Sequence, residues 1–136
     1  MTTSHWFKAH VHELGTGECR DYLLNHVVGR IVLDDDQGPV AFPVNYALDG
    51  NDIVIAVSAD GEIARHATGH PVAFEIDDID PANEAGWSVV VRGVAEQAAD
   101  LPQDPDGRPY PWAEGNRSHL LRIRPQSVSG RQLIPA

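Results

Sequence analysis

The sequence predicts a mainly β protein that forms a small closed or half-closed barrel. Six segments are rich in valine, isoleucine and phenylalanine and are bounded by glycine, aspartate and proline, as strands between turns are. Short loops that contain Asp and Gly join several of them, which favours hairpins. Only two segments show the spacing of a helix, so a sheet that curls on itself is the simplest architecture.

The predicted strands are residues 27–33, 39–48, 52–58, 71–77, 86–97 and 119–126. The hairpin loops Asp34–Gly38 and Asp49–Asp52 connect the first three of them. The fifth strand alternates between two faces. One face is apolar and carries Trp87, Val89, Val91 and Ala95. The opposite face is polar and carries Ser88, Arg92 and Glu96.

Two short helices are predicted, over residues 17–27 and near residues 62–69. The first shows apolar residues and one histidine at helical spacing, namely Cys19, Tyr22, Leu23, His26 and Val27. We expect Thr16 to cap this helix and Glu18 to interact favourably with the positive end of its dipole. Cys19, on the apolar face, is expected to be a buried small side chain.

Residues 99–118 differ from the rest of the chain. Four prolines and the pairs Asp-Gly and Glu-Gly make regular structure improbable there. A loop of this length in a compact domain is usually a functional flap or a surface cover. Tyr110 and Trp112 stand in this proline-stiffened loop, and because aromatic side chains are costly to leave in water we expect them to lie over the barrel.

Size and composition limit the function. A chain of 136 residues is expected to form one domain, residues 1–136, with residues 1–13 as an N-terminal extension. The net charge of −10 argues against nucleic acid or an anionic membrane surface as partner. No apolar run is long enough to span a bilayer, and the N-terminus lacks a signal-peptide core, so a cytoplasmic protein is expected. The single Cys19 excludes an intrachain disulfide and a cysteine zinc cage.

Common catalytic and metal motifs are absent. The sequence contains no Rossmann glycine motif, no P-loop and no GxSxG elbow. His10 and His12 could ligate a metal together, but no third ligand is suitably spaced, and an exposed N-terminal segment is the favoured interpretation. His66 and His70 could share one face of the short helix, and we favour a polar helix face. The acidic run 75–80 lacks the glycine and closing glutamate of a calcium loop, and we favour a solvated strand end.

The segment between the third and fourth strands, residues 58–71, is the best candidate for an anion site. It reads as a Ser/Asp/Gly turn followed by a short helix. Backbone N–H groups at such a turn form a natural cradle for a phosphate.

The order of these elements resembles the pyridoxamine 5′-phosphate oxidase-like, FMN-binding split-barrel family. The resemblance covers about residues 14–134 and rests on order and spacing. It is carried by Pro43-Val44-Asn45-Tyr46, by Gly86–Gly93, and by Arg122-Ile123-x-Pro125 followed by Gly130-Arg131. The family fold implies a six-stranded split barrel that forms a homodimer, with flavin at the dimer interface. Residues 102–116 are then expected near the dimer cleft.

The resemblance also implies which residues contact the flavin. The strand-two residues Pro43, Val44, Asn45 and Tyr46 would contact the isoalloxazine ring. Val57, Ser58 and Ala59 would approach the ribityl chain and the phosphate. Trp87 and Ser88 would reach the site from the partner subunit, although Trp87 could equally belong to the barrel core. Asn45 lies in a strand and needs a hydrogen-bond partner, which favours a ligand role.

The chain departs from the family at the phosphate. Many relatives place basic residues where this sequence has Gly61, Glu62 and Ile63, and the negative charge of Glu62 opposes a dianion. The N–H groups of the turn, at Gly61 and its neighbours, together with Arg65 or Arg30, are the candidates to compensate.

Two classes of function therefore stay open. The first, which we favour, is an FMN-dependent oxidoreductase with a small-molecule substrate, or a variant that uses the deazaflavin F420. The second is a split-barrel dimer that has lost FMN and binds haem or is not an enzyme. No metal site is predicted in either.

Overall fold

The computed structural model describes residues 10–135 and is mainly β, as the sequence predicts. Its helices are α1 (Thr16–Leu24), α2 (Glu62–Ala67) and the 3₁₀ turn η2 (Pro105–Gly107). Its strands are β1 (His10–Glu13), β2 (Val28–Asp35), β3 (Gly38–Asp49), β4 (Asp52–Val57), β5 (Pro71–Asp80), β6 (Ala85–Gln97), β7 (His119–Ile123) and β8 (Ser127–Ile134).

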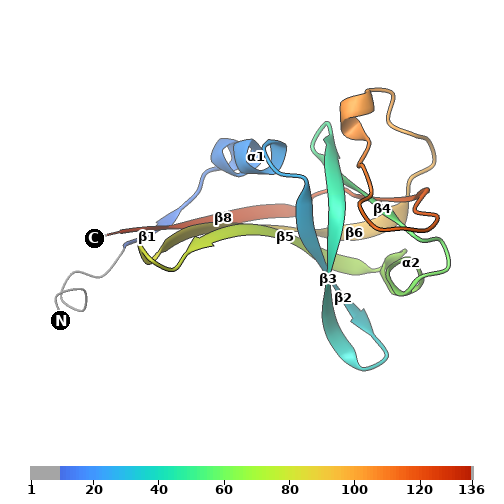
Figure 1. The fold of residues 1–136 in the computed structure, drawn as a ribbon, viewed down its shortest axis with the longest axis horizontal. Coiled ribbons are helices and arrows are strands. Elements are labelled where there is room, and N and C mark those ends of the chain that lie inside the picture. The colour runs from blue at the N-terminus through green and yellow to red at the C-terminus, as the bar shows by residue number, and fades with distance from the viewer. Residues whose placement is uncertain (1–9, 136) are drawn as a thin grey trace.

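Six of the strands close into a barrel. The sheet order within the described residues is β1-β8-β6-β5-β2-β3-β4-β7, and β7 also pairs with β6, which completes a ring of β6, β5, β2, β3, β4 and β7. The two remaining strands, β8 and β1, extend the sheet from the free edge of β6. The expected six-stranded split barrel is thereby confirmed (Figure 1).

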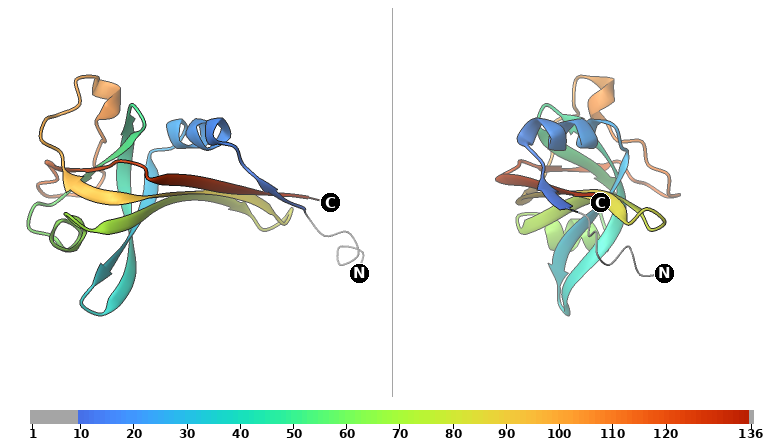
Figure 2. Two further views of the ribbon diagram at one scale, coloured as in Figure 1. Left: turned by 180° about the vertical axis from the view of Figure 1, so that it is seen from behind. Right: turned by 90° about the vertical axis from the view of Figure 1, so that its left-hand side faces the viewer.

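The sheet continues beyond the barrel as an arm, which we define as β1, β8 and the paired ends of β5 and β6 at residues 77–80 and 85–88. Helix α1 lies on one side of the arm, against β8, and the β2–β3 hairpin projects from the barrel on the opposite side (Figures 1 and 2). Both faces of the arm are thus accessible except where α1 covers one of them.

Local sequence explains most element boundaries. Two-residue turns at Asp36-Gln37 and Gly50-Asn51 join β2 to β3 and β3 to β4, in the predicted loops. Gly50 adopts a φ of +62°, a conformation that glycine reaches without strain. Two expectations need correction. Gly15 and not Thr16 precedes α1, with its N–H donating to Glu18 Oε1 at 3.0 Å. Helix α2 ends at Ala67, so His70 does not share a helix face with His66.

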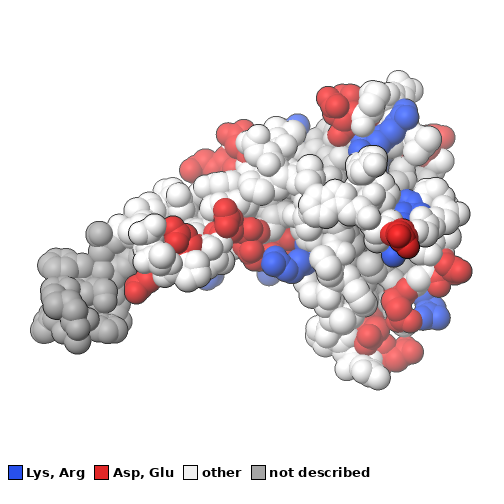
Figure 3. Space-filling model, viewed as in Figure 1, with Lys and Arg blue, Asp and Glu red and all other residues white. Residues whose placement is uncertain are grey.

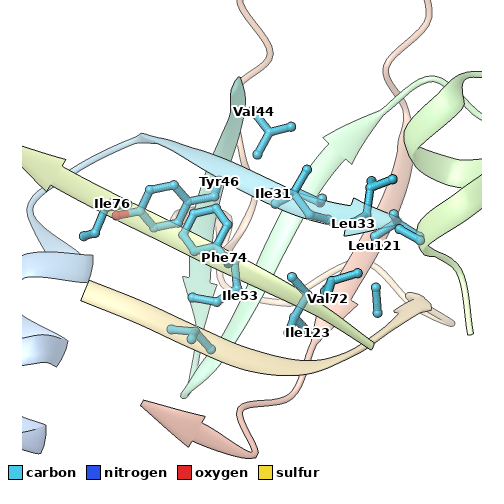
Figure 4. Packing of buried hydrophobic residues seen from close by; sticks show 14 of the residues in the cluster. Ile31, Leu33, Val44, Tyr46, Ile53, Val72, Phe74, Ile76, Leu121 and Ile123 are labelled. Atoms are coloured by element: carbon cyan, nitrogen blue, oxygen red, sulfur yellow. The ribbon is translucent and has the colours of Figure 1, made fainter. Parts of the chain in front are cut away.

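The core fills the barrel and continues under α1. Its largest buried side chains include Phe74 of β5, whose ring meets the edge of Tyr46 at a centroid distance of 4.8 Å. Ile31, Ile53 and Ile123 enter the same space from β2, β4 and β7 (Figure 4). Cys19 is fully buried, as expected. A Cβ at Gly130 would lie 2.7 Å from its sulfur, so a glycine there allows α1 to approach β8.

The extension expected at residues 1–13 lies largely outside the described residues, but His10–Glu13 form β1 and pair with β8. No helix within residues 10–135 has the length and apolar character needed to cross a membrane.

Candidate functional site

Three of the predicted contact residues share the outer face, which we define as the side of the barrel wall that points away from the core. Ser88 lies on the same side of the sheet, where the sheet continues into the arm. Strand alternation turns Arg30, Pro43, Asn45 and Ser88 away from the core. The residues that alternate with them in β2, β3 and β6 are buried or half-buried. Arg30 pairs with Pro43 across β2–β3, and Val28 pairs with Asn45 one step further along. The sheet therefore brings predicted residues from different strands, 13 to 58 positions apart, onto one side.

Three other predicted residues point the opposite way. Val44, Tyr46 and Val57 are buried in the barrel core. The Tyr46 hydroxyl donates to the carbonyl of Leu23 at 2.6 Å, and burial raises the pKa of this phenol. The side chains of these residues hold the barrel together, so only their backbone groups are available to a ligand.

Trp87 packs beneath α1. Its ring stacks on Tyr22 at a centroid distance of 3.9 Å and an interplanar angle of 20°, with His26 at 4.9 Å. Of these two partners only Tyr22 lies in α1, because the helix ends at Leu24 and not at the predicted residue 27. The contact with Tyr22 places the Trp87 side chain on the opposite side of the sheet from Ser88.

A charged cluster occupies the centre of the outer face. Arg30 Nη1 contacts Glu75 Oε1 at 2.9 Å and Asp77 Oδ2 at 3.1 Å. Partial burial, together with the neighbouring Asp77, raises the pKa of Glu75 to about 7 although Arg30 acts in the opposite direction. Figure 3 shows acidic and basic side chains gathered where the arm meets the barrel. Arg30 is thus already engaged by two carboxylates.

The turn predicted to bind a phosphate, Ser58–Gly61, forms hydrogen bonds within itself. Ser58 Oγ donates to Asp60 Oδ1 at 2.7 Å, which lowers the pKa of Asp60, and the Gly61 N–H donates to the carbonyl of Ser58. Ala59 is exposed between them. Arg65 forms an ion pair with Glu62. The turn therefore presents carboxylates, and its basic residue is occupied.

The proline-rich segment, which we define as residues 99–118, contacts the outer face. The Trp112 N–H donates to Asn45 Oδ1 at 2.9 Å, so part of the hydrogen-bonding capacity of Asn45 is used within the chain. The side chains of Tyr110 and Trp112 are 81% and 69% exposed. At its other end, η2 packs against β3. The segment thus contacts the barrel, but the expectation that Tyr110 and Trp112 cover it is wrong, because both are largely exposed to solvent. The relation of the segment to a dimer cleft stays a prediction.

The surface of the described residues has a larger and a smaller hollow, and predicted contact residues line only the smaller one. The larger, about 1480 Å³, is a polar groove between the 98–104 segment and the β7–β8 turn, and no predicted contact residue lines it. A smaller hollow of about 320 Å³ lies on the arm, lined by Trp87, Ser88 and several apolar residues. Within residues 10–135, no group of histidine, cysteine or carboxylate side chains is placed to hold a metal ion.

Comparison with known proteins identifies relatives over almost the whole chain. The family model described as pyridoxamine 5′-phosphate oxidase matches residues 16–132. The uncharacterized protein Rv0080 of Mycobacterium tuberculosis is 31% identical over 129 residues, which are 90% of this chain and 85% of that protein. The structure of an FAD binding protein from Mycobacterium smegmatis has a TM-score of 0.73 and 30% identity, covering 91% of this chain and 99% of its own. An FAD and heme binding protein from the same organism shares the fold, with a TM-score of 0.66 and 19% identity over 91% of this chain and 75% of its own.

Proposed function

Because the chain belongs to the pyridoxamine 5′-phosphate oxidase family, we propose that it is an FMN-dependent oxidoreductase whose flavin lies on the outer face beside Asn45. The observation that carries this proposal is the convergence of Asn45, Pro43 and the Trp112 backbone on one accessible surface. A bound flavin would supply the redox chemistry, and the protein would supply position and electrostatics.

The residues of this surface fit the ring of a flavin. Asn45 keeps an amide NH₂ group for the polar edge of the ring, because its hydrogen bond to Trp112 uses only the oxygen. Pro43 offers an apolar surface, and the exposed Trp112 can cover one face of a planar ligand. Binding and orientation of the ring are the roles that these side chains can fulfil.

The residues of the 58–63 turn fit a phosphate poorly. Asp60 and Glu62 place two carboxylates beside the position where a dianion would bind, and the Arg65 guanidinium is paired with Glu62. We therefore expect weaker FMN binding than a basic residue at this turn would provide.

The arm supports a proposal of a homodimer. Val11, Ile79 and Leu133 are exposed on its outer side and surround the hollow of about 320 Å³ over Gly86. Exposed apolar side chains clustered on one surface are typical of a protein–protein interface. Twofold pairing of two chains through this surface would bury the cluster of each copy. Light scattering at micromolar concentration is expected to give twice the mass of 14.8 kDa. A monomer at that concentration would contradict the proposal.

Titration with flavin tests the proposed function. We expect the fluorescence of FMN to be quenched on addition of protein, with saturation at one flavin per chain. FAD is a necessary second probe, because the M. smegmatis relative binds FAD. The absorption spectrum of the purified protein distinguishes flavin from F420 and haem. A colourless protein that quenches neither FMN nor FAD would contradict the proposal.

A further inference from the structure

One arginine of the proline-rich segment has an unexplained environment. Arg117 Nε is the one buried side-chain nitrogen or oxygen without a hydrogen-bond partner among the residues that the structure describes. A guanidinium group offers five N–H donors, and leaving a buried donor unpaired is unfavourable. Buried polar groups normally have a partner, so an unpaired one indicates a water molecule or a ligand.

The sheet register places Arg117 next to the turn predicted to hold a phosphate. His119 pairs with Val57 at the end of β4, and the turn Ser58–Gly61 begins directly after Val57. Since the strands are antiparallel, the chain preceding His119 runs alongside the chain following Val57. Arg117 precedes His119 by only two residues, which places its backbone beside that turn.

Hydrogen bonds order this segment and attach it to the outer face. The Trp112 N–H is bonded to Asn45 on the outer face, and Ser118 donates through both its N–H and its hydroxyl to Asn116 Oδ1. The segment that contains Arg117 is therefore tied to β3 on one side and continues into β7 on the other. Residues 112–117 therefore connect the surface proposed to bind the flavin ring with the turn Ser58–Gly61.

The arginines first expected to compensate are otherwise engaged. Arg65 is paired with Glu62, and Arg30 contacts both Glu75 and Asp77. Moving either of them to a phosphate would leave at least one of these carboxylates without its ion pair. By contrast, Arg117 Nε donates no hydrogen bond to a carboxylate or to any other group of the described residues.

We propose that Arg117 binds the phosphate of the flavin nucleotide, in place of the basic residue that the 58–63 turn lacks. This inference rests on the proposed function, because it requires a flavin on the outer face. A planar guanidinium can donate two parallel hydrogen bonds to phosphate oxygens. The proline-rich segment then contributes at two points, at the ring through Trp112 and at the phosphate through Arg117.

FMN and riboflavin differ only in the phosphate, so their affinities for the wild type and for Arg117→Gln isolate this contact. We expect Arg117→Gln to weaken FMN binding about tenfold or more, while riboflavin binding changes less than about twofold. Arg124→Gln, at an exposed arginine of the β7–β8 turn, makes the same change in charge and should alter neither affinity. If Arg117→Gln does not fold, Arg117→Met retains the apolar stem and removes the charge.

The outcomes separate this inference from the proposed function. Equal losses for FMN and riboflavin, or no loss for either, would overturn the role of Arg117 alone. A wild-type protein that binds both flavins with equal affinity would also overturn it, since no phosphate contact would then exist. A wild type that binds neither flavin would overturn both proposals.

Discussion

Replacement of Phe74 by alanine is expected to lower the free energy of unfolding by about 3–5 kcal/mol. Phe74 is fully buried at the centre of the barrel, opposite Ile31 on β2 and Val91 on β6, and its ring contacts Tyr46. It also covers Gly29, where an added Cβ would collide with the Phe74 ring. Because β2, β5 and β6 meet around this ring, its loss leaves a cavity that small shifts cannot fill. Urea denaturation followed by circular dichroism measures the effect.

Tyr110→Ala is the matched control for this variant, because it also truncates an aromatic side chain to a methyl group. The Tyr110 side chain is 81% exposed, so its removal should change the free energy of unfolding by less than about 0.5 kcal/mol. Comparable losses in the two variants would mean that Phe74 is not the centre of the core.

Introduction of a lysine at position 63 is expected to tighten FMN binding by about tenfold to a hundredfold. A charge-assisted contact to phosphate is worth roughly 1.5–3 kcal/mol, and Ile63 follows directly after the turn and Glu62. Ile63 packs in part against the core, so Ile63→Lys should also lower thermal stability, with the long side chain reaching outward to solvent. Quenching of FMN fluorescence gives the affinity, and thermal unfolding gives the stability.

Two further variants define the cause of this gain. Ile63→Met introduces an unbranched apolar chain without charge and should leave FMN affinity unchanged. Glu62→Gln removes the repulsion of the dianion and releases Arg65, so it should give a smaller gain that added salt reduces. A gain with Ile63→Met as large as with Ile63→Lys would exclude a charge effect at the turn.

The six barrel strands could be predicted because their own residues encode them. Runs such as Ile53–Val57 and Val89–Val91 are strongly apolar and bounded by turn residues. Strands β1 and β8 were not predicted, since Ser127–Ile134 contains few consecutive apolar residues and one glycine. These two strands form through pairing, β8 with β6 and β1 with β8, and such long-range pairing leaves little local signal.

The site could be predicted only in part, for the same reason. Alternation along β3 already separates Pro43 and Asn45 from Val44 and Tyr46, and applied strictly it would have assigned the latter pair to the core. The hydrogen bond between Asn45 and Trp112 joins residues 67 positions apart and had no signal in the sequence. The engagement of Arg30 and Arg65 by carboxylates likewise depends on the register and on the geometry of the folded chain.

Hydrogen exchange with and without saturating FMN tests the central claim, that the flavin lies on the outer face between Asn45 and the proline-rich segment. We predict slower exchange at residues 110–118 and in the turn Ser58–Gly61, because the ligand would cover both. Exchange should stay unchanged at residues 98–104 and 124–126, which line the large polar groove. Protection confined to that groove, with residues 110–118 unaffected, would contradict the account.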